Sequence, residues 1–244
     1  MTKTILFPNF VSNNLSMDNQ KVWLVTNATG GLGFILVKQL LNNGHKVAVM
    51  ERDPVDLTKA IGGGYSDDFL PQAVDLASSV CVEDAIDRTI ACFGKIDSVV
   101  INAGHGLPGS LEELTDREVR ENFNTNVFGM LNVIRGVMMY LRQQRSGHIF
   151  NVSPSGELYD NLPGQGIYYA AKFAVQGFTG SLAPEVKDLG IRVTIVSPEG
   201  HPEKIAAAII RAAEEPDAPS HLQVGKGDCK WSVLKKVPGF VPFE

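Results

Sequence analysis

The chain of 244 residues has few cysteines, no excess of positive charge and no long apolar stretch. Its three cysteines, Cys81, Cys92 and Cys229, lack CxxC spacing, which argues against a zinc site and a disulfide framework and favours free thiols. A net charge of -5 argues against nucleic acid or an anionic membrane as the main partner. No apolar stretch approaches the roughly 20 residues that span a bilayer. We therefore expect a cytoplasmic protein that acts on a small molecule, with no membrane and no nucleic-acid partner.

Metal and hydrolase chemistry have little support in the sequence. The histidines are scattered without the spacing of metal ligands, so we expect no metal site; they are His45, His105, His148, His201 and His221. Neither Ser153 nor Ser155 lies in a G-x-S-x-G elbow, which makes an α/β-hydrolase a poor interpretation.

Strand and helix patterns alternate through most of the chain. Residues 1–20 contain a short apolar patch broken by Pro8, which indicates an extension or arm rather than a signal peptide. Residues 21–244 are predicted to form a single α/β domain, with a parallel sheet covered on both faces. The expected strands are 21–26, 46–51, 72–76, 96–102, 148–152, 191–197 and 221–224, and the expected helices are 34–41, 82–93, 115–144, 165–187 and 202–215.

Tyr168 and Lys172 form the chemical centre of the sequence. A helix that starts near Gln165 places residues four apart on one face, so the phenol and the ammonium lie side by side. An ammonium there lowers the pKa of the tyrosine from about 10 and suits it to proton transfer. The Y-x-x-x-K spacing also occurs by chance on many helices. Ser155, thirteen positions before Tyr168, follows a buried strand, and Ser153 is a competing candidate for the same role.

A glycine-rich turn follows the first expected strand, in Thr26-Asn27-Ala28-Thr29-Gly30-Gly31-Leu32-Gly33. A turn in the first βα unit is where a Rossmann-type fold holds a pyrophosphate on backbone N–H groups. A tight turn used only for packing is the alternative.

Together these features make the chain resemble the short-chain dehydrogenase/reductase family, including ketoreductases and retinol or hydroxysteroid dehydrogenases. The likeness runs from Lys21 to about Val196 and implies a doubly wound Rossmann-type fold with strand order 3-2-1-4-5-6-7. It also implies transfer of a hydride between NAD or NADP and an alcohol or carbonyl compound. Tyr168 would be the general acid or base, Lys172 would lower its pKa, Ser155 would orient the substrate oxygen and Asn126 would hold a water that replenishes the proton.

The resemblance also implies the binding residues. The expected cofactor contacts are Thr26, Asn27, Thr29, Gly31, Leu32, Gly33, Glu51, Arg52, Asp75, Asn102, Ala103, Gly104, Tyr168, Lys172 and Pro198. The expected substrate contacts are His105, Ser155 and Tyr159. Glu51 at the end of the second strand would bind the ribose 2′-OH, whereas Arg52 would suit a 2′-phosphate, and we favour NAD.

Three departures from the family pattern leave alternatives open. Asn27 replaces a motif glycine, Pro154 precedes Ser155, and the chain enters a helix soon after Pro198, where the family has a substrate-covering segment. The open hypotheses are an active oxidoreductase, a non-catalytic nucleotide-binding sensor or interaction protein, and an enzyme whose lid comes from another subunit or from the arm. Apolar residues on two long helices, among them Met138, Met139 and Phe173, predict a homodimer or homotetramer.

Overall fold

The computed structural model describes residues 3–4, 20–62, 66–102, 104, 106–153, 162–225 and 229–232, with 3–4 and 229–232 described by their backbone alone. Seven strands form a parallel sheet in the order β4 (Phe69–Ala73), β3 (Lys46–Glu51), β2 (Val22–Thr26), β5 (Ser98–Ile101), β6 (Gly147–Val152), β7 (Ile191–Pro198) and β8 (His221–Val224). This is the order 3-2-1-4-5-6-7 predicted from the sequence.

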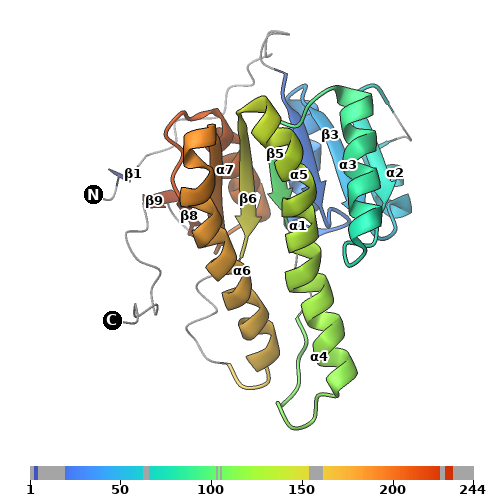
Figure 1. Cartoon of the computed structure of the whole chain (residues 1–244), viewed down its shortest axis with the longest axis vertical. Coiled ribbons are helices and arrows are strands. Elements are labelled where there is room, and N and C mark those ends of the chain that lie inside the picture. Colours follow the sequence, from blue (N-terminus) through green and yellow to red (C-terminus); the bar gives the residue numbers. More distant parts are fainter. Residues whose placement is uncertain are drawn as a thin grey trace.

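The sheet continues past β8 with two short antiparallel strands. Strand β9 (Cys229–Ser232) pairs with β8, and β1 (Lys3–Thr4) pairs with β9 (Figure 1). Segments from the two ends of the chain therefore meet at one edge of the sheet, a feature that the sequence did not predict.

Helices cover both faces of the sheet (Figure 1). One face carries three helical segments. The first is α3 (Ser79–Phe93), and the second is a continuous helix made of α4 (Asp116–Phe123), a π-helical turn (Asn124–Phe128) and α5 (Gly129–Gln144). The third is α6 (Gly166–Val186), which runs into a 3-10 turn (Lys187–Leu189). The other face carries α1 (Gly31–Asn42), α2 (Val55–Ile61) and α7 (Pro202–Glu214). In the part of the chain that the structure describes, no helix is both long enough and apolar enough to cross a membrane.

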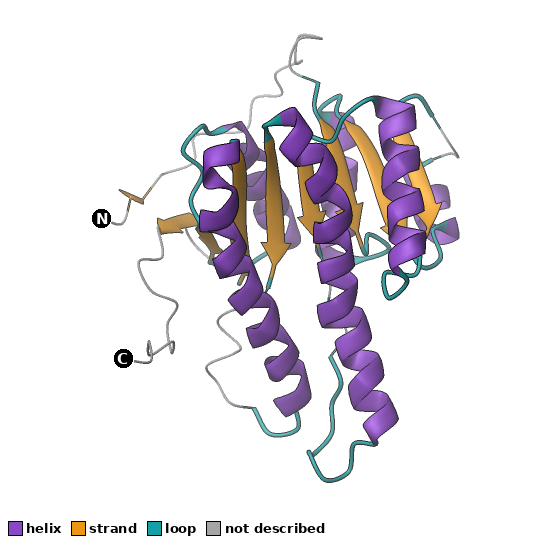
Figure 2. Cartoon of the chain, in the orientation of Figure 1, coloured by secondary structure: helices purple, strands orange, loops and turns teal. Residues whose placement is uncertain are grey.

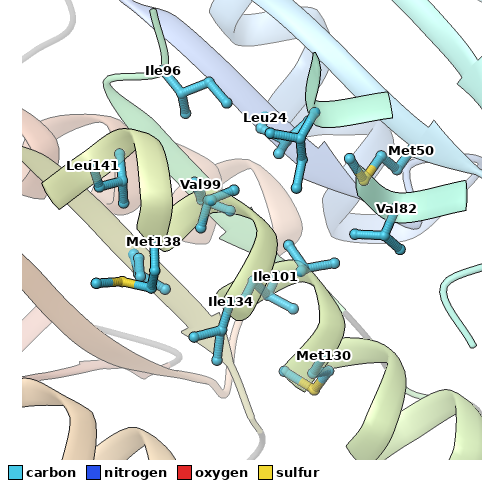
Figure 3. Packing of buried hydrophobic residues seen from close by; sticks show 14 of the residues in the cluster. Leu24, Met50, Val82, Ile96, Val99, Ile101, Met130, Ile134, Met138 and Leu141 are labelled. Carbon is cyan, nitrogen blue, oxygen red and sulfur yellow. The ribbon is translucent and has the colours of Figure 1, made fainter. Parts of the chain in front are cut away.

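Each face of the sheet has its own apolar core, because parallel strands buried on both sides carry apolar residues on both sides. Leu24 and Ile101 point to the face of α3 and α5, where they meet Val82 and Met130 (Figure 3). Trp23 points to the opposite face and stacks on Phe150, with ring centroids 6.1 Å apart.

The structure differs most from the sequence prediction at the third strand and at α2, while several other elements begin or end two or three residues away from the predicted bounds. The third strand is Phe69–Ala73 rather than 72–76. It contains Pro71, which is tolerated because β4 is the edge strand of the sheet, where a missing N–H leaves no ladder hydrogen bond unmade. Helix α2 was not predicted. Thr115 and Glu118 have the hydroxyl-to-glutamate spacing of a capping box, and the structure forms one: the Thr115 hydroxyl accepts a hydrogen bond from the Glu118 N–H, and the Glu118 carboxylate accepts one from the Thr115 N–H.

The carboxyl ends of the parallel strands define the functional end of the molecule. The strands point toward this end, and α4 and the first turns of α6 extend beyond it (Figure 2). At this end of the sheet, only residues 199–201 connect β7 to α7. The helix that follows β7 then packs against α1.

Candidate active site

The turn between β2 and α1 is shaped for close approach of a ligand. Gly31 has φ +53°, and a Cβ on Gly33 would lie 2.4 Å from the Asn27 carbonyl oxygen, so Gly33 is required by packing. Helix α1 starts at Gly31 without a side-chain cap and without an acidic residue in its first turn. Its first N–H groups therefore remain available to an anion such as a pyrophosphate.

Asn27 keeps the turn in the backbone conformation that a glycine would adopt. Its φ is +51°, in the left-handed region that asparagine tolerates better than most residues. Asn102 ties the turn to β5, since its side-chain amide donates to the Asn27 carbonyl at 3.0 Å and its backbone N–H donates to the Thr26 hydroxyl at 3.0 Å. The departure from glycine at position 27 is therefore accommodated by the backbone.

An acidic cavity of about 630 Å³ lies beside this turn. Glu51 is 8% exposed, and its carboxylate accepts hydrogen bonds from the Thr29 hydroxyl at 3.1 Å, the Thr29 N–H at 3.2 Å and the Arg52 N–H at 3.0 Å. The Arg52 guanidinium lies 4.0 Å from the Asp75 carboxylate, and both side chains are exposed. The cavity lining also includes residues that the sequence analysis did not predict as contacts, namely Asp53, Asp56, Leu76, Leu107, Glu118, Glu121 and Asn122.

Tyr168 and Lys172 lie side by side on α6, as their spacing requires. The Lys172 ammonium is 5.4 Å from the centre of the Tyr168 ring. Lys172 is 1% exposed, and its burial lowers the pKa of the ammonium from 10.5 to about 8. Gly104 lies against this ammonium, because a Cβ on Gly104 would be 2.6 Å from Lys172 Nζ. The loop after β5 and the start of α6 therefore meet at the two groups.

Asn126 is fully buried within the π-helical turn between α4 and α5. The π turn inserts an extra residue into the helix, and such turns are frequent at functional sites. Asn122, one helical turn earlier, is also buried and lines the acidic cavity. The sequence analysis missed Asn122. Its spacing of four from Asn126 places two amides on one apolar helix face, and a buried amide needs polar partners, so this spacing could have indicated it.

The structure brings only part of the predicted site together. Ser155, Tyr159, Ala103 and His105 lie outside the described residues. The competing candidate Ser153 is fully buried at the end of β6. Pro198 is the last residue of β7, at the carboxyl end of the sheet.

Comparison with known proteins establishes the class of the chain. The family model described as short chain dehydrogenase matches residues 21–210, and the chain belongs to this family. It is 35% identical over 180 residues to oxidoreductase BOA17 of Botryotinia fuckeliana, covering 74% of this chain and 65% of that protein. It is 36% identical over 178 residues to a 3-ketodihydrosphingosine reductase of Bacteroides thetaiotaomicron, covering 73% and 63%. The match thus spans just under two thirds of each relative's length.

Solved structures show the same fold. A short-chain dehydrogenase from Streptomyces avermitilis superposes with a TM-score of 0.79 at 28% identity, over 85% of this chain and 89% of that one. A 3-ketoacyl-(acyl-carrier-protein) reductase from Brucella melitensis, complexed with NADH, superposes with a TM-score of 0.78 at 25% identity, over 85% and 97%.

Proposed function

We propose that the protein is an NAD(H)-dependent oxidoreductase that interconverts an alcohol and a carbonyl compound. The observation that carries this proposal is the pairing of Tyr168 with the buried Lys172 ammonium beside Gly104. When bound, the nicotinamide supplies or accepts the hydride, and the protein supplies position and proton transfer. The glycine turn, the open N-terminus of α1 and the adjoining cavity fit a dinucleotide of this kind.

Each of four side chains has its own role in proton transfer. In the reduction direction, Tyr168 donates a proton to the substrate oxygen, and the nearby Lys172 cation stabilises the phenolate that remains. Ser155 hydrogen-bonds the substrate oxygen and orients it. Lys172 then passes a proton toward the Tyr168 phenolate, and Asn126, buried in the π turn, holds a water that returns a proton from solvent to Lys172.

The charges around the cavity favour NAD(H) over NADP(H). Glu51, Asp53, Asp56 and Asp75 line it together with a single arginine, Arg52, whose guanidinium is already 4.0 Å from Asp75. A 2′-phosphate placed near Glu51 would be repelled by several carboxylates, whereas a ribose 2′-OH can donate a hydrogen bond to one.

Replacement of Tyr168 by Phe tests the proposal. We expect Tyr168→Phe to bind NADH as the native protein does but to lose carbonyl reduction by at least about 100-fold, the usual contribution of a positioned acid. Tyr169→Phe is the matched control, because Tyr169 is the neighbouring tyrosine and is 8% exposed. Native turnover in Tyr168→Phe would exclude this residue as the acid.

A nucleotide-binding protein without turnover is the second candidate. The three-residue connection 199–201 favours it, because a covering segment after β7 would exclude water from the reaction. NADH binding without reduction of any compound in a carbonyl panel would support this candidate. Deleting residues 1–17 then tests whether the N-terminal arm completes the enzyme: lost turnover with retained folding and NADH binding would assign the arm to the active site.

We also propose that the protein is cytoplasmic and forms a homodimer or homotetramer through α5 and α6. Met139 is 63% exposed and Phe173 is 45% exposed, and each projects from one of these helices. Met138 instead lies in the core. Sedimentation at micromolar concentration tests the assembly, and a monomer would reject it.

A further inference from the structure

A serine and a histidine outside the proposed chemistry form a short polar contact at the carboxyl end of the sheet. The Ser197 hydroxyl oxygen lies 2.6 Å from His221 Nε2, which joins β7 to β8. Ser197 is fully buried, so it is not exposed as a nucleophile. The same hydroxyl donates a long hydrogen bond of 3.5 Å to the Ser153 carbonyl at the end of β6.

The backbone hydrogen bonds between β6 and β7 explain why the Ser153 carbonyl accepts a hydrogen bond from a side chain. The Ser153 N–H donates to the Val196 carbonyl at 2.9 Å. In a parallel ladder, the next hydrogen bond runs from the N–H of residue 198 back to the Ser153 carbonyl. Residue 198 is proline, which has no N–H. The β6–β7 ladder is therefore interrupted at the point where β6 ends, and the Ser197 hydroxyl stands in for the missing donor.

We propose that His221 and Ser197 are positioning residues, which act through the Ser153 carbonyl to hold the strand end that leads to the candidate catalytic Ser155. The catalytic part of this statement rests on the proposed function. The hydrogen bonds form one chain when His221 Nε2 carries a proton: Nε2–H donates to Ser197 Oγ, and the Ser197 hydroxyl donates to Ser153. The opposite neutral tautomer would draw the Ser197 proton to the imidazole and leave the Ser153 carbonyl without that donor.

The surroundings of His221 favour the neutral ring near pH 7. Burial lowers the pKa of His221 below its usual 6.5, while the charge of Glu199 acts in the other direction. The Glu199 carboxylate accepts a hydrogen bond from the Gln223 side-chain amide at 3.1 Å. Because the ring is neutral, its tautomer decides whether the Ser153 carbonyl has its donor.

A second hydroxyl–histidine pair, which joins β6 to β7, provides a matched control. His148 Nε2 lies 2.8 Å from the Thr194 hydroxyl oxygen, and this hydroxyl donates to the Pro219 carbonyl at 2.6 Å. Thr194 is fully buried in β7, as Ser197 is, but it lies three residues before Ser197 and farther from the carboxyl end. Its loss therefore tests the general effect of removing a buried hydroxyl from β7.

The first experiment measures the strand end without any substrate. Amide hydrogen exchange of Ser153, relative to Ile149 in the middle of β6, is followed by NMR in the native protein, Ser197→Ala, Ser197→Thr and Thr194→Val. We expect Ser153 to exchange roughly two- to tenfold faster in Ser197→Ala, the range for one lost hydrogen bond, and to stay near native in Ser197→Thr and Thr194→Val. An unchanged ratio in Ser197→Ala, or an equal rise in Thr194→Val, overturns the proposal.

Two further measurements separate this proposal from the proposed function. Nitrogen-15 NMR of the native protein should show His221 protonated on Nε2, and protonation on Nδ1 alone would refute the chain of hydrogen bonds. Where the native protein reduces a carbonyl with NADH, Ser197→Ala should lower kcat about two- to tenfold with an unchanged Kd for NADH, and Thr194→Val should not; equal kcat values would overturn the catalytic part. Absence of turnover in the native protein would count against the proposed function, while the exchange and tautomer results would still decide the contact itself.

Discussion

Gly104 and Lys172 fit together so closely that a single methyl group would separate them. A Cβ on Gly104 would lie 2.6 Å from Lys172 Nζ and 3.2 Å from its Cε, and the φ of Gly104 is +151°. An alanine at this position would be strained in its backbone and would press on the buried ammonium. The lysine and the glycine loop after β5 therefore constrain each other.

Gly104→Ala should lower the rate of carbonyl reduction at least about tenfold, because the added methyl group displaces the Lys172 ammonium. A tenfold loss corresponds to about 1.4 kcal/mol of transition-state stabilisation. The control is Gly106→Ala, since the nearest atom to a Cβ there is the Gln165 Oε1 atom at 3.9 Å. Steady-state kinetics on both variants, with their melting temperatures, would separate loss of geometry from loss of folding. Equal activity of the two variants would contradict the close fit.

The buried Lys172 should make stability depend on alkaline pH. Its pKa is about 8 in the folded protein and 10.5 ordinarily, so between these values the unfolded chain holds a proton that the folded protein has released. The free energy of unfolding should therefore rise with pH across this window, by up to roughly 3 kcal/mol relative to Lys172→Met. Below pH 8 the difference between the two proteins should be constant.

Urea unfolding from pH 7 to 10.5 would measure this difference. Lys59→Met serves as the control, because Lys59 is an exposed lysine on α2. Parallel stability curves for the native protein and Lys172→Met would show that the ammonium is not destabilised by burial.

Glu51 should set the choice of cofactor. We expect the native protein to bind NADH more tightly than NADPH. Glu51→Ser removes the buried carboxylate at the end of β3 and should narrow the ratio of the two dissociation constants about tenfold, which corresponds to about 1.4 kcal/mol. Fluorescence titration of the two reduced nicotinamides measures both constants. Thr29→Val is the control, since it removes the hydroxyl contact to Glu51 but keeps the charge. If both variants changed the ratio of the NADH and NADPH dissociation constants equally, the shape of the turn rather than the charge of Glu51 would set the cofactor preference.

Asn27 should tolerate glycine but not alanine. At φ +51°, Asn27→Ala should destabilise the protein by about 1 to 2 kcal/mol, whereas Asn27→Gly should be close to neutral. Arg145, which ends α5, also has φ +51°, and Arg145→Gly should therefore stabilise the protein by up to about 1 kcal/mol. Denaturant unfolding measures all three, and an Ala variant as stable as the native protein would argue against a strained turn.

Much of the fold could be predicted from local patterns. Apolar runs placed the central strands, the Thr115–Glu118 spacing located the start of α4, and the Tyr168–Lys172 spacing placed two groups on one helix face. These features depend on residues close in sequence. The sequence prediction placed β4 at 72–76, whereas the strand is Phe69–Ala73 and contains Pro71. Only the sheet order shows that this strand lies at an edge, where a proline is tolerated.

Other features depend on contacts between distant segments. Two contacts join elements that are far apart in the sequence: Gly104 lies against Lys172, and the Ser197 hydroxyl lies against His221. The hydrogen bonds from Thr29 to Glu51 bridge two strand ends in the same way. A single sequence contains the residue types for these contacts but not the register that brings them together.

The π-helical turn has a consequence for how this chain can change. Because residues 124–128 hold one residue more than a regular helix needs, removing one residue there would let α4 and α5 merge into an ordinary helix. Everything before the deletion would then rotate by about 100° relative to α5, carrying Asn122 away from the cavity that it lines. The segment from Asp116 to Gln144 should accordingly accept many changes of side chain but few changes of length.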